Sequence, residues 1–249
     1  MANRPPILLN SYSLKEGMRI LTKDPIALFN YVNQGIQCSV DRQLLQLCNF
    51  LGWRMDNVVC YLNQIRNNGK FQDTVKSRLG NINYGQVICP EVLYVIVREL
   101  SPYQVVETGV SAGVSSAYIL QALEDNGKGK LYSIDLPNIA IKEAHTVDET
   151  GFVIPDYLRQ RWSLRVGKSY DLLRPLLAEI GNIDMFLHDS EHTYNTMQWE
   201  YEVAWMSLDK NGLIVSHDIN DNSAFCDFAH CVKRKYKEIF FTGIGVIKK

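Results

Sequence analysis

Hydrophobic positions follow two different rhythms along the chain, and the change falls near residue 85. Before that point apolar residues recur every three or four positions, which is the spacing of an amphipathic helix. After it, stretches of helical length alternate with short apolar runs that are bounded by Gly, Asp and Pro. The pattern predicts a helical N-terminal cap over residues 1–85 and a second, larger unit over residues 86–249.

Local signals divide the N-terminal cap into separate helices. Asp24 and Pro25 have the form of an N-cap followed by proline at the first helical position. Gly35 predicts the end of that helix, and Ser39 predicts the cap of the next one. A further short helix is predicted over residues 59–65, and the two asparagines and the glycine that follow are expected to end it.

Short apolar runs rich in β-forming residues predict the strands of the second unit. They lack a clean alternation of polar and apolar positions, as expected for strands that are covered on both faces. The runs are 104–108, 130–134, 162–166, 183–188 and 212–216. Because helix-sized segments separate them, they predict a doubly wound α/β sheet. Two last runs, 237–241 and 245–248, predict an antiparallel hairpin.

Composition excludes several classes of protein. The 249 residues include 26 Lys and Arg against 27 Asp and Glu, and 46% are hydrophobic, so disorder is excluded as the main state. With a net charge of −1, the chain is not expected to bind nucleic acid. No uncharged apolar run reaches the roughly 18 residues that cross a bilayer, and the first ten residues do not form a signal peptide. No cysteines form a Cys-x-x-Cys pair, so we expect reduced thiols in a cytoplasmic protein.

A glycine turn after the first predicted strand is the most specific motif. The strand ends in Glu107, and Gly109 and Gly113 then allow the backbone to turn sharply and approach a ligand. The helix that begins near Gly113 directs its positive end at the turn, which suits a carboxylate. A dinucleotide site would have a second glycine where Ser111 stands. Glu107 would also be unfavourable beside a diphosphate, whereas it suits the ammonium of an amino acid.

A second acid, Asp135, ends the next predicted strand. In doubly wound folds an acid at this place accepts the hydrogens of both ribose hydroxyls. The two acids and the turn therefore describe a ligand that has a ribose, an amine and a carboxylate. S-adenosyl-methionine has all three groups and lacks phosphates.

The glycine turn resembles motif I of class I S-adenosyl-methionine-dependent methyltransferases, and residues 84–228 resemble the methyltransferase 24 family. The segments 151–159, 186–194 and 212–219 carry the narrower resemblance. It implies the Rossmann-like, seven-stranded methyltransferase sheet, mostly parallel with a C-terminal antiparallel hairpin. The N-terminal cap, which matches no family, is then expected to cover the pocket and select the substrate.

The resemblance also implies a set of cofactor contacts at the ends of the first four strands. They are Glu107, Gly109, Ser111, Gly113, Ser115, Asp135, Gly167, Ser169 and His188, with Asp135 on the ribose. The family often has Asp between the residues that correspond to Gly167 and Ser169, near the adenine. Lys168 stands there in this chain, which leaves Ser169 and the backbone to make the adenine contact.

Acids and histidines gather at the ends of the fourth and fifth predicted strands. Asp189 and Asp218 follow these strands, with His192 and His217 beside them. Ligands of an open parallel sheet lie beyond the carboxyl ends of its strands, so both acids should face the crevice that holds Asp135. Two uncompensated carboxylates would repel one another there.

Two catalytic interpretations and one structural interpretation stay open for this cluster. In the first, Asp189 and Asp218, with Asn220 as a further ligand, hold Mg²⁺, which lowers the pKa of an acceptor hydroxyl. In the second, His192 acts without metal as the general base beside Asp189. In the third, Asp189 caps a helix and His192 bonds to a backbone carbonyl.

Taken together, the sequence predicts a methyltransferase that uses S-adenosyl-methionine to methylate the hydroxyl of a small molecule. A hydroxylase-like or non-catalytic ligand-binding protein of the same fold is the alternative. A membrane partner is not expected, and assembly into a homo-oligomer is left open.

Overall fold

The computed structural model describes residues 25–80, 89–136, 150–240 and 242–249. Asp24, the expected helix cap, lies outside the described residues, as do the first ten residues and Phe241. Within the described part, no helix combines the length and the apolar character needed to cross a membrane.

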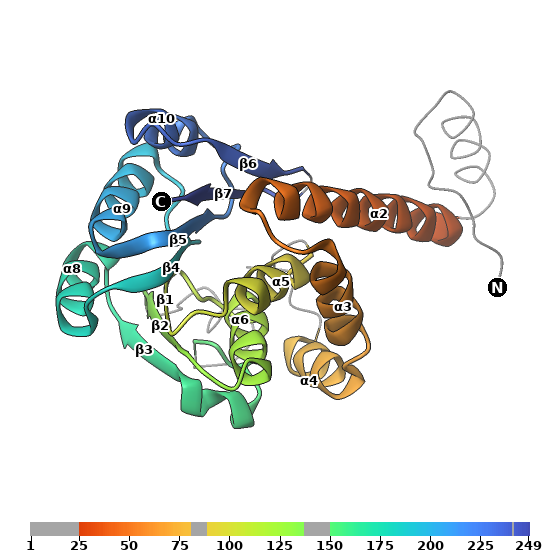
Figure 1. Ribbon diagram of the computed structural model, residues 1–249. Coiled ribbons are helices and arrows are strands. Elements are labelled where there is room, and N and C mark those ends of the chain that lie inside the picture. The colour runs from red at the N-terminus through yellow and green to blue at the C-terminus, as the bar shows by residue number, and fades with distance from the viewer. Residues whose placement is uncertain (1–24, 81–88, 137–149, 241) are drawn as a thin grey trace.

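A seven-stranded sheet forms the centre of the described structure, in the order β3-β2-β1-β4-β5-β7-β6 (Figure 1). Its strands are β1 (Gln104–Thr108), β2 (Lys130–Asp135), β3 (Trp162–Val166), β4 (Ile183–His188), β5 (Leu208–Ser216), β6 (Tyr236–Ile239) and β7 (Ile244–Lys248). The first five strands pair in parallel, whereas β7 pairs antiparallel with both β5 and β6. The predicted methyltransferase sheet with its C-terminal hairpin is therefore confirmed.

The strand β5 begins at Leu208, whereas the sequence predicted a start at residue 212. Leu208 pairs with Ile183, and the register then shifts before Leu213 pairs with Met185. Asn211, at a φ of +136°, lies within this irregular stretch. The strand is thus interrupted by a bulge, which a run of apolar residues alone cannot reveal.

Two hydrophobic cores cover the two faces of the sheet, as the uninterrupted apolar strands predict. Successive residues point to opposite faces, so Val105 belongs to one core and Val106 to the other. One face carries α5 (Glu91–Leu100) and α6 (Val114–Asp125). The other face carries α8 (Ser169–Ile180), α9 (Tyr194–Ser207) and α10 (Ala224–Cys231), drawn in cyan to blue in Figure 1. The short 3₁₀ helix η1 (Asp156–Arg161) precedes β3.

The N-terminal region consists of α2 (Pro25–Leu51), α3 (Met55–Arg66) and α4 (Gly69–Leu79). The predicted break at Gly35 and the predicted cap at Ser39 are wrong, because α2 runs through both residues. A glycine inside a helix costs only about 1 kcal/mol. Buried packing of Val40, Leu44 and Leu47 in the same helix offsets that cost.

The N-terminal helices join the core of the α5–α6 face rather than forming a core of their own. Leu44 of α2, Ile65 of α3 and Phe71 of α4 all belong to the cluster that contains Val105 of β1. In Figure 1 these helices lie on the α5–α6 side of the sheet, and the first turns of α2 extend away from it. Their expected role in selecting the substrate stays a prediction.

Candidate functional site

The glycine turn joins β1 to α6 at the carboxyl end of the sheet. Gly109 and Gly113 have φ values of +86° and +93°, in the region that favours glycine, and Gly113 is the N-cap of α6. A Cβ atom on Gly109 would lie only 1.9 Å from the carbonyl oxygen of Asp189. The close approach that requires this glycine is therefore one between two segments of the protein, and it places Asp189 against the turn.

Asp135 lies directly beside the same turn. One of its carboxylate oxygens accepts a hydrogen bond from the Ser111 N–H at 2.8 Å, and the other accepts from Leu136 N–H at 2.8 Å. Burial raises the pKa of Asp135, while these backbone hydrogen bonds oppose the rise. A third backbone hydrogen bond comes from Val110. About one of the four acceptor positions of the carboxylate therefore stays open for a hydroxyl hydrogen.

Glu107 is fully buried on the α6 side of the sheet. Its Oε1 atom accepts hydrogen bonds from the hydroxyls of Ser116 and Ser133, both at 2.5 Å. Its Oε2 atom is buried and has no hydrogen-bond partner within the described residues. Burial raises the pKa of Glu107 to about 8. An ammonium donor would satisfy the unpartnered oxygen, so the residue fits the amine of an amino-acid ligand.

Ser115, Gly167 and Ser169, which the resemblance also implicates, all lie near this edge. Ser115 is buried in the first turn of α6. Gly167 follows β3, and its N–H donates to the carbonyl of Asp135 at 2.8 Å. The Ser169 hydroxyl donates to Glu200 of α9. Ser169 is thereby tied to a buried acid, and any contact with adenine has to share that hydroxyl.

Glu200 is a residue of this edge that the sequence analysis missed. Its fully buried carboxylate accepts from Thr108 Oγ1 at 2.5 Å and from Ser190 Oγ at 2.9 Å, and it lies 2.7 Å from His188 Nδ1. Despite burial, these neighbours lower its pKa. The signal in the sequence is a glutamate one position before Tyr201, on the stripe that packs against the sheet.

The fully buried His188 side chain is therefore fixed by its contact with Glu200. Its ring packs edge-on against that of His192, with 5.5 Å between centroids. The predicted cofactor contact of His188 stays a prediction, since a ligand would have to reach its buried Nε2 atom.

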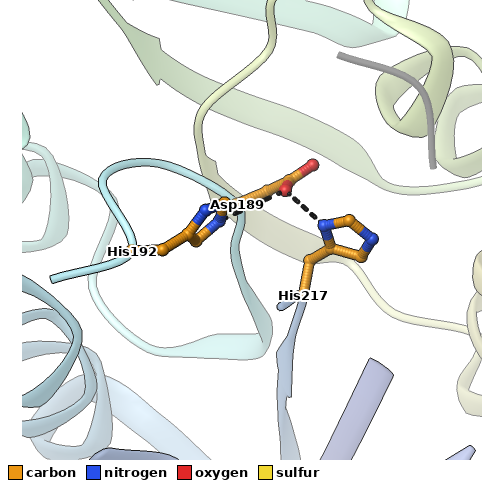
Figure 2. Close-up of side chains that lie close together, drawn as sticks. All are labelled: Asp189, His192 and His217. Carbon is orange, nitrogen blue, oxygen red and sulfur yellow. Dashed lines mark ion pairs between the residues drawn. The ribbon is translucent and has the colours of Figure 1, made fainter. Parts of the chain in front are cut away.

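Asp189, His192, His217 and Asp218 converge at the ends of β4 and β5, and we call them the Asp–His cluster. Figure 2 shows the Asp189 carboxylate between the rings of His192 and His217. Asp189 Oδ1 lies 3.0 Å from His217 Nδ1 and 3.8 Å from His192 Nε2. Asp218 Oδ2 lies 3.3 Å from His217 Nδ1 and 3.4 Å from His192 Nδ1. Each histidine thus bridges the two acids.

A loop, and not a helix, brings Asp189 and His192 together. The helix α9 begins at Tyr194, and the Thr193 side chain caps it by accepting from Thr196 N–H. The third interpretation, in which Asp189 caps a helix, is therefore wrong. His217 is anchored separately, through a backbone hydrogen bond from its N–H to the His188 carbonyl at 2.9 Å.

Opposite charges stabilise the ionised forms within the cluster. Burial opposes ionisation of Asp189, yet the nearby imidazoles of His192 and His217 lower its pKa. The nearby carboxylates of Asp189 and Asp218 raise the pKa of His192. Burial works against protonation of His217, but Asp189 and Asp218 raise its pKa overall. The two acids are therefore compensated by imidazoles, in contrast to the uncompensated pair that the sequence analysis expected.

The donor set of the cluster does not fit the expected Mg²⁺ site. Magnesium requires oxygen ligands in near-octahedral geometry, whereas His217 Nδ1 occupies the space between the two carboxylates. Asn220, the expected further ligand, is exposed. The residue that lies close enough to His192 and Asp218 to share a metal ion with them is Asp221. Nitrogen atoms are thus part of both candidate sets of metal ligands among the described residues.

Comparison with known proteins agrees with this architecture. A family model described as a methyltransferase domain, methyltransferase 24, matches residues 106–219. No curated protein gives a significant match.

Several solved structures resemble the fold. An O-methyltransferase from Bacillus cereus in complex with SAH has a TM-score of 0.51 at 13% identity, covering 82% of this chain and 96% of its own. The O-methyltransferase TomG from Streptomyces achromogenes, in complex with SAM, has a TM-score of 0.51 at 15% identity, covering 73% and 89%. A methyltransferase from Geobacter sulfurreducens has a TM-score of 0.50 at 18% identity, covering 72% and 87%.

The matched residues run from β1, through the glycine turn, Asp135 and Asp189, to the end of β5. They contain the parallel strands whose carboxyl ends form the site described above. Residues 106–219 of this chain are therefore similar to the methyltransferase 24 family.

Proposed function

We propose that this protein transfers a methyl group from S-adenosyl-methionine to a hydroxyl group of a small molecule. The observation that carries the proposal is the position of the Asp–His cluster, which Gly109 brings against the glycine turn beside Asp135. The complexes of the Bacillus cereus and Streptomyces achromogenes enzymes with SAH and SAM support the choice of cofactor.

The β1 and β2 ends would bind the cofactor. Asp135 would accept a ribose hydroxyl hydrogen at the acceptor position that its three backbone N–H donors leave open. Binding of the amine would deprotonate Glu107 and give its buried Oε2 atom a partner. When bound, S-adenosyl-methionine supplies a sulfonium-activated methyl group. The protein then has to align the acceptor oxygen with that group and exclude water, and such positioning can supply about 7–11 kcal/mol.

The Asp–His cluster would receive the acceptor proton. The C–S bond breaks with its electrons going to sulfur, the new O–C bond forms, and the hydroxyl proton moves to an imidazole nitrogen. His192 is the better candidate base of the two histidines because its side chain is 25% exposed, against 13% for His217, and its buried Nε2 atom has no hydrogen-bond partner within the described residues. Asp189 and Asp218 hold it from two sides and stabilise the charged ring that results.

Calorimetry with S-adenosyl-methionine tests the cofactor, with NAD as the competing ligand. Asp135→Ala should weaken binding by about 2–4 kcal/mol, because hydrogen bonds to a charged acceptor are lost. Asp184→Ala is the matched control. Asp184 also accepts hydrogen bonds from two backbone N–H groups, those of Tyr103 and Gln104, but it lies near the N-terminal end of β4, opposite to the end that forms the site. The control should bind the cofactor as the parent does. Equal affinity of parent and Asp135→Ala, or binding of NAD alone, would contradict the proposal.

A methyl-transfer assay separates this function from the alternatives. S-adenosyl-methionine with a labelled methyl group is incubated with a panel of small hydroxyl compounds, and label in the products is measured. A non-catalytic ligand-binding protein would bind the cofactor and yield no labelled product. A hydroxylase-like protein would add oxygen to the acceptor and no label. A small-molecule acceptor and a cytoplasmic location are parts of the same proposal.

A further inference from the structure

We propose that Asp189, His192 and His217 form a binding site for a divalent first-row transition-metal ion of the zinc type, and not for magnesium. The inference goes beyond the proposed methyl transfer, because it concerns which ion these three side chains hold and requires neither cofactor nor acceptor. It starts from the mismatch between the cluster and a site made of oxygen ligands.

The spacing of the three donor atoms suits one ion. Asp189 Oδ1 lies 3.0 Å from His217 Nδ1 and 3.8 Å from His192 Nε2 (Figure 2). One ligand atom from each residue lies within 4.8 Å of the others. Bonds of about 2.1 Å in a tetrahedral site give edges of about 3.4 Å between ligand atoms. The two distances bracket that edge, so small side-chain rotations would complete the coordination.

The chemistry of the donors selects the class of ion. Two imidazoles and one carboxylate are the ligands that zinc, cobalt, nickel and ferrous ions prefer, whereas magnesium prefers oxygen and keeps its waters. Three protein ligands leave a coordination position open. The three residues come from the β4–α9 loop and from the end of β5, so the fold brings them together from two sides.

Asp218 provides a supporting interaction that metal-binding histidines usually have. Its Oδ2 atom lies 3.4 Å from His192 Nδ1, while the opposite nitrogen of the same ring faces Asp189. A carboxylate on one ring nitrogen orients the other nitrogen toward a metal and strengthens it as a ligand. Asp218 would therefore orient His192. The same Oδ2 atom lies 3.3 Å from His217 Nδ1, so Asp218 can also reach the open coordination position.

An ion at this place would coordinate His192 through Nε2, the ring nitrogen that faces Asp189. A nitrogen bound to metal cannot accept a proton. Occupancy and the base role of His192 therefore exclude one another.

Titration of the chelator-treated full chain with Co²⁺ tests the site without cofactor or acceptor. We expect one equivalent to bind with visible ligand-field absorption, Zn²⁺ to displace it, and Mg²⁺ in large excess to leave it in place. His192→Ala and His217→Ala should each weaken Co²⁺ binding at least about 10-fold. His230→Ala is the matched control, because His230 is an exposed histidine beside Cys226 on α10, away from the cluster.

His192 lies in a loop outside regular structure, so His192→Ala keeps the test valid if His217→Ala fails to fold. Thermal denaturation of each variant checks the fold. Absence of binding, displacement by Mg²⁺, or loss of the spectrum in His230→Ala with full retention in His192→Ala would each overturn the site. Since no S-adenosyl-methionine is present, failure here is distinct from failure of the cofactor calorimetry.

Discussion

Two halves of the same sheet edge are built in different ways. The β1–β2 half contains the glycine turn, the buried Glu107 and the half-buried Asp135. Neighbouring hydroxyls donate to Glu107, and backbone N–H groups donate to Asp135. The β4–β5 half consists of side chains from separate loops that pair with one another, Asp189 and Asp218 with His192 and His217.

This difference separates binding from chemistry. Backbone donors in a tight turn have a fixed geometry, which suits a half that binds one invariant ligand. Paired imidazoles and carboxylates can exchange a proton or an ion, which suits a half where bonds change. Variants of the two halves should therefore fail in different assays.

The largest expected effect is on turnover, in the β4–β5 half. His192→Ala should lower the rate of methyl transfer by about 10²–10⁴, because loss of a general base has this effect. Affinity for S-adenosyl-methionine should stay within about twofold of the parent, since the residue does not belong to the cofactor half. Rates are measured at saturating cofactor with His230→Ala as control. A variant that loses cofactor affinity and keeps its rate would reverse the assignment of the two halves.

A substitution at the junction should damage both halves. In Gly109→Ala the new Cβ meets the Asp189 carbonyl, which is backbone and cannot rotate away. Gly127→Ala is the control, because Gly127 also has a positive φ, of +68°, but its Cβ would meet nothing within 4 Å. We expect Gly109→Ala to lower the free energy of unfolding by about 1–3 kcal/mol more than the control does, as overpacking does. Equal losses in denaturant unfolding would show that the contact with Asp189 is not tight.

The buried acid of the cofactor half predicts a pH dependence of stability. The folded state keeps Glu107 protonated up to a pKa of about 8, whereas an unfolded glutamate loses its proton near the ordinary value of 4.5. Between these values the folded state binds more protons, so stability falls as pH rises. From roughly pH 6 to 7.5 this amounts to about 2 kcal/mol, at about 1.4 kcal/mol per pH unit.

Glu107→Gln removes the titrating group and keeps the shape of the side chain. The difference in unfolding free energy between parent and variant, followed by denaturant unfolding at several pH values, should therefore shift in favour of the variant as pH rises over this range. A constant difference would mean that Glu107 is ionised in the folded protein at neutral pH.

Local patterns in the sequence were sufficient to determine the sheet and its functional edge. Short apolar runs specify β1, β2 and β4, with Glu107, Asp135 and His188 at or next to the strand ends, because β-forming residues and turn residues act over a few positions. The glycine turn and the C-terminal hairpin were predictable for the same reason.

Contacts between distant segments were decided only by the tertiary structure. The continuity of α2 through Gly35 depends on packing that no residue near Gly35 specifies. In the sequence, Glu200 is one polar position of a helix. Only the folded structure surrounds it with Thr108, His188 and Ser190. His217 stands next to Asp218 in the sequence, but its position between Asp218 and Asp189 requires β4 and β5 to pair. Periodicity encodes which face a residue occupies, whereas the partner it meets there depends on how separate elements pack.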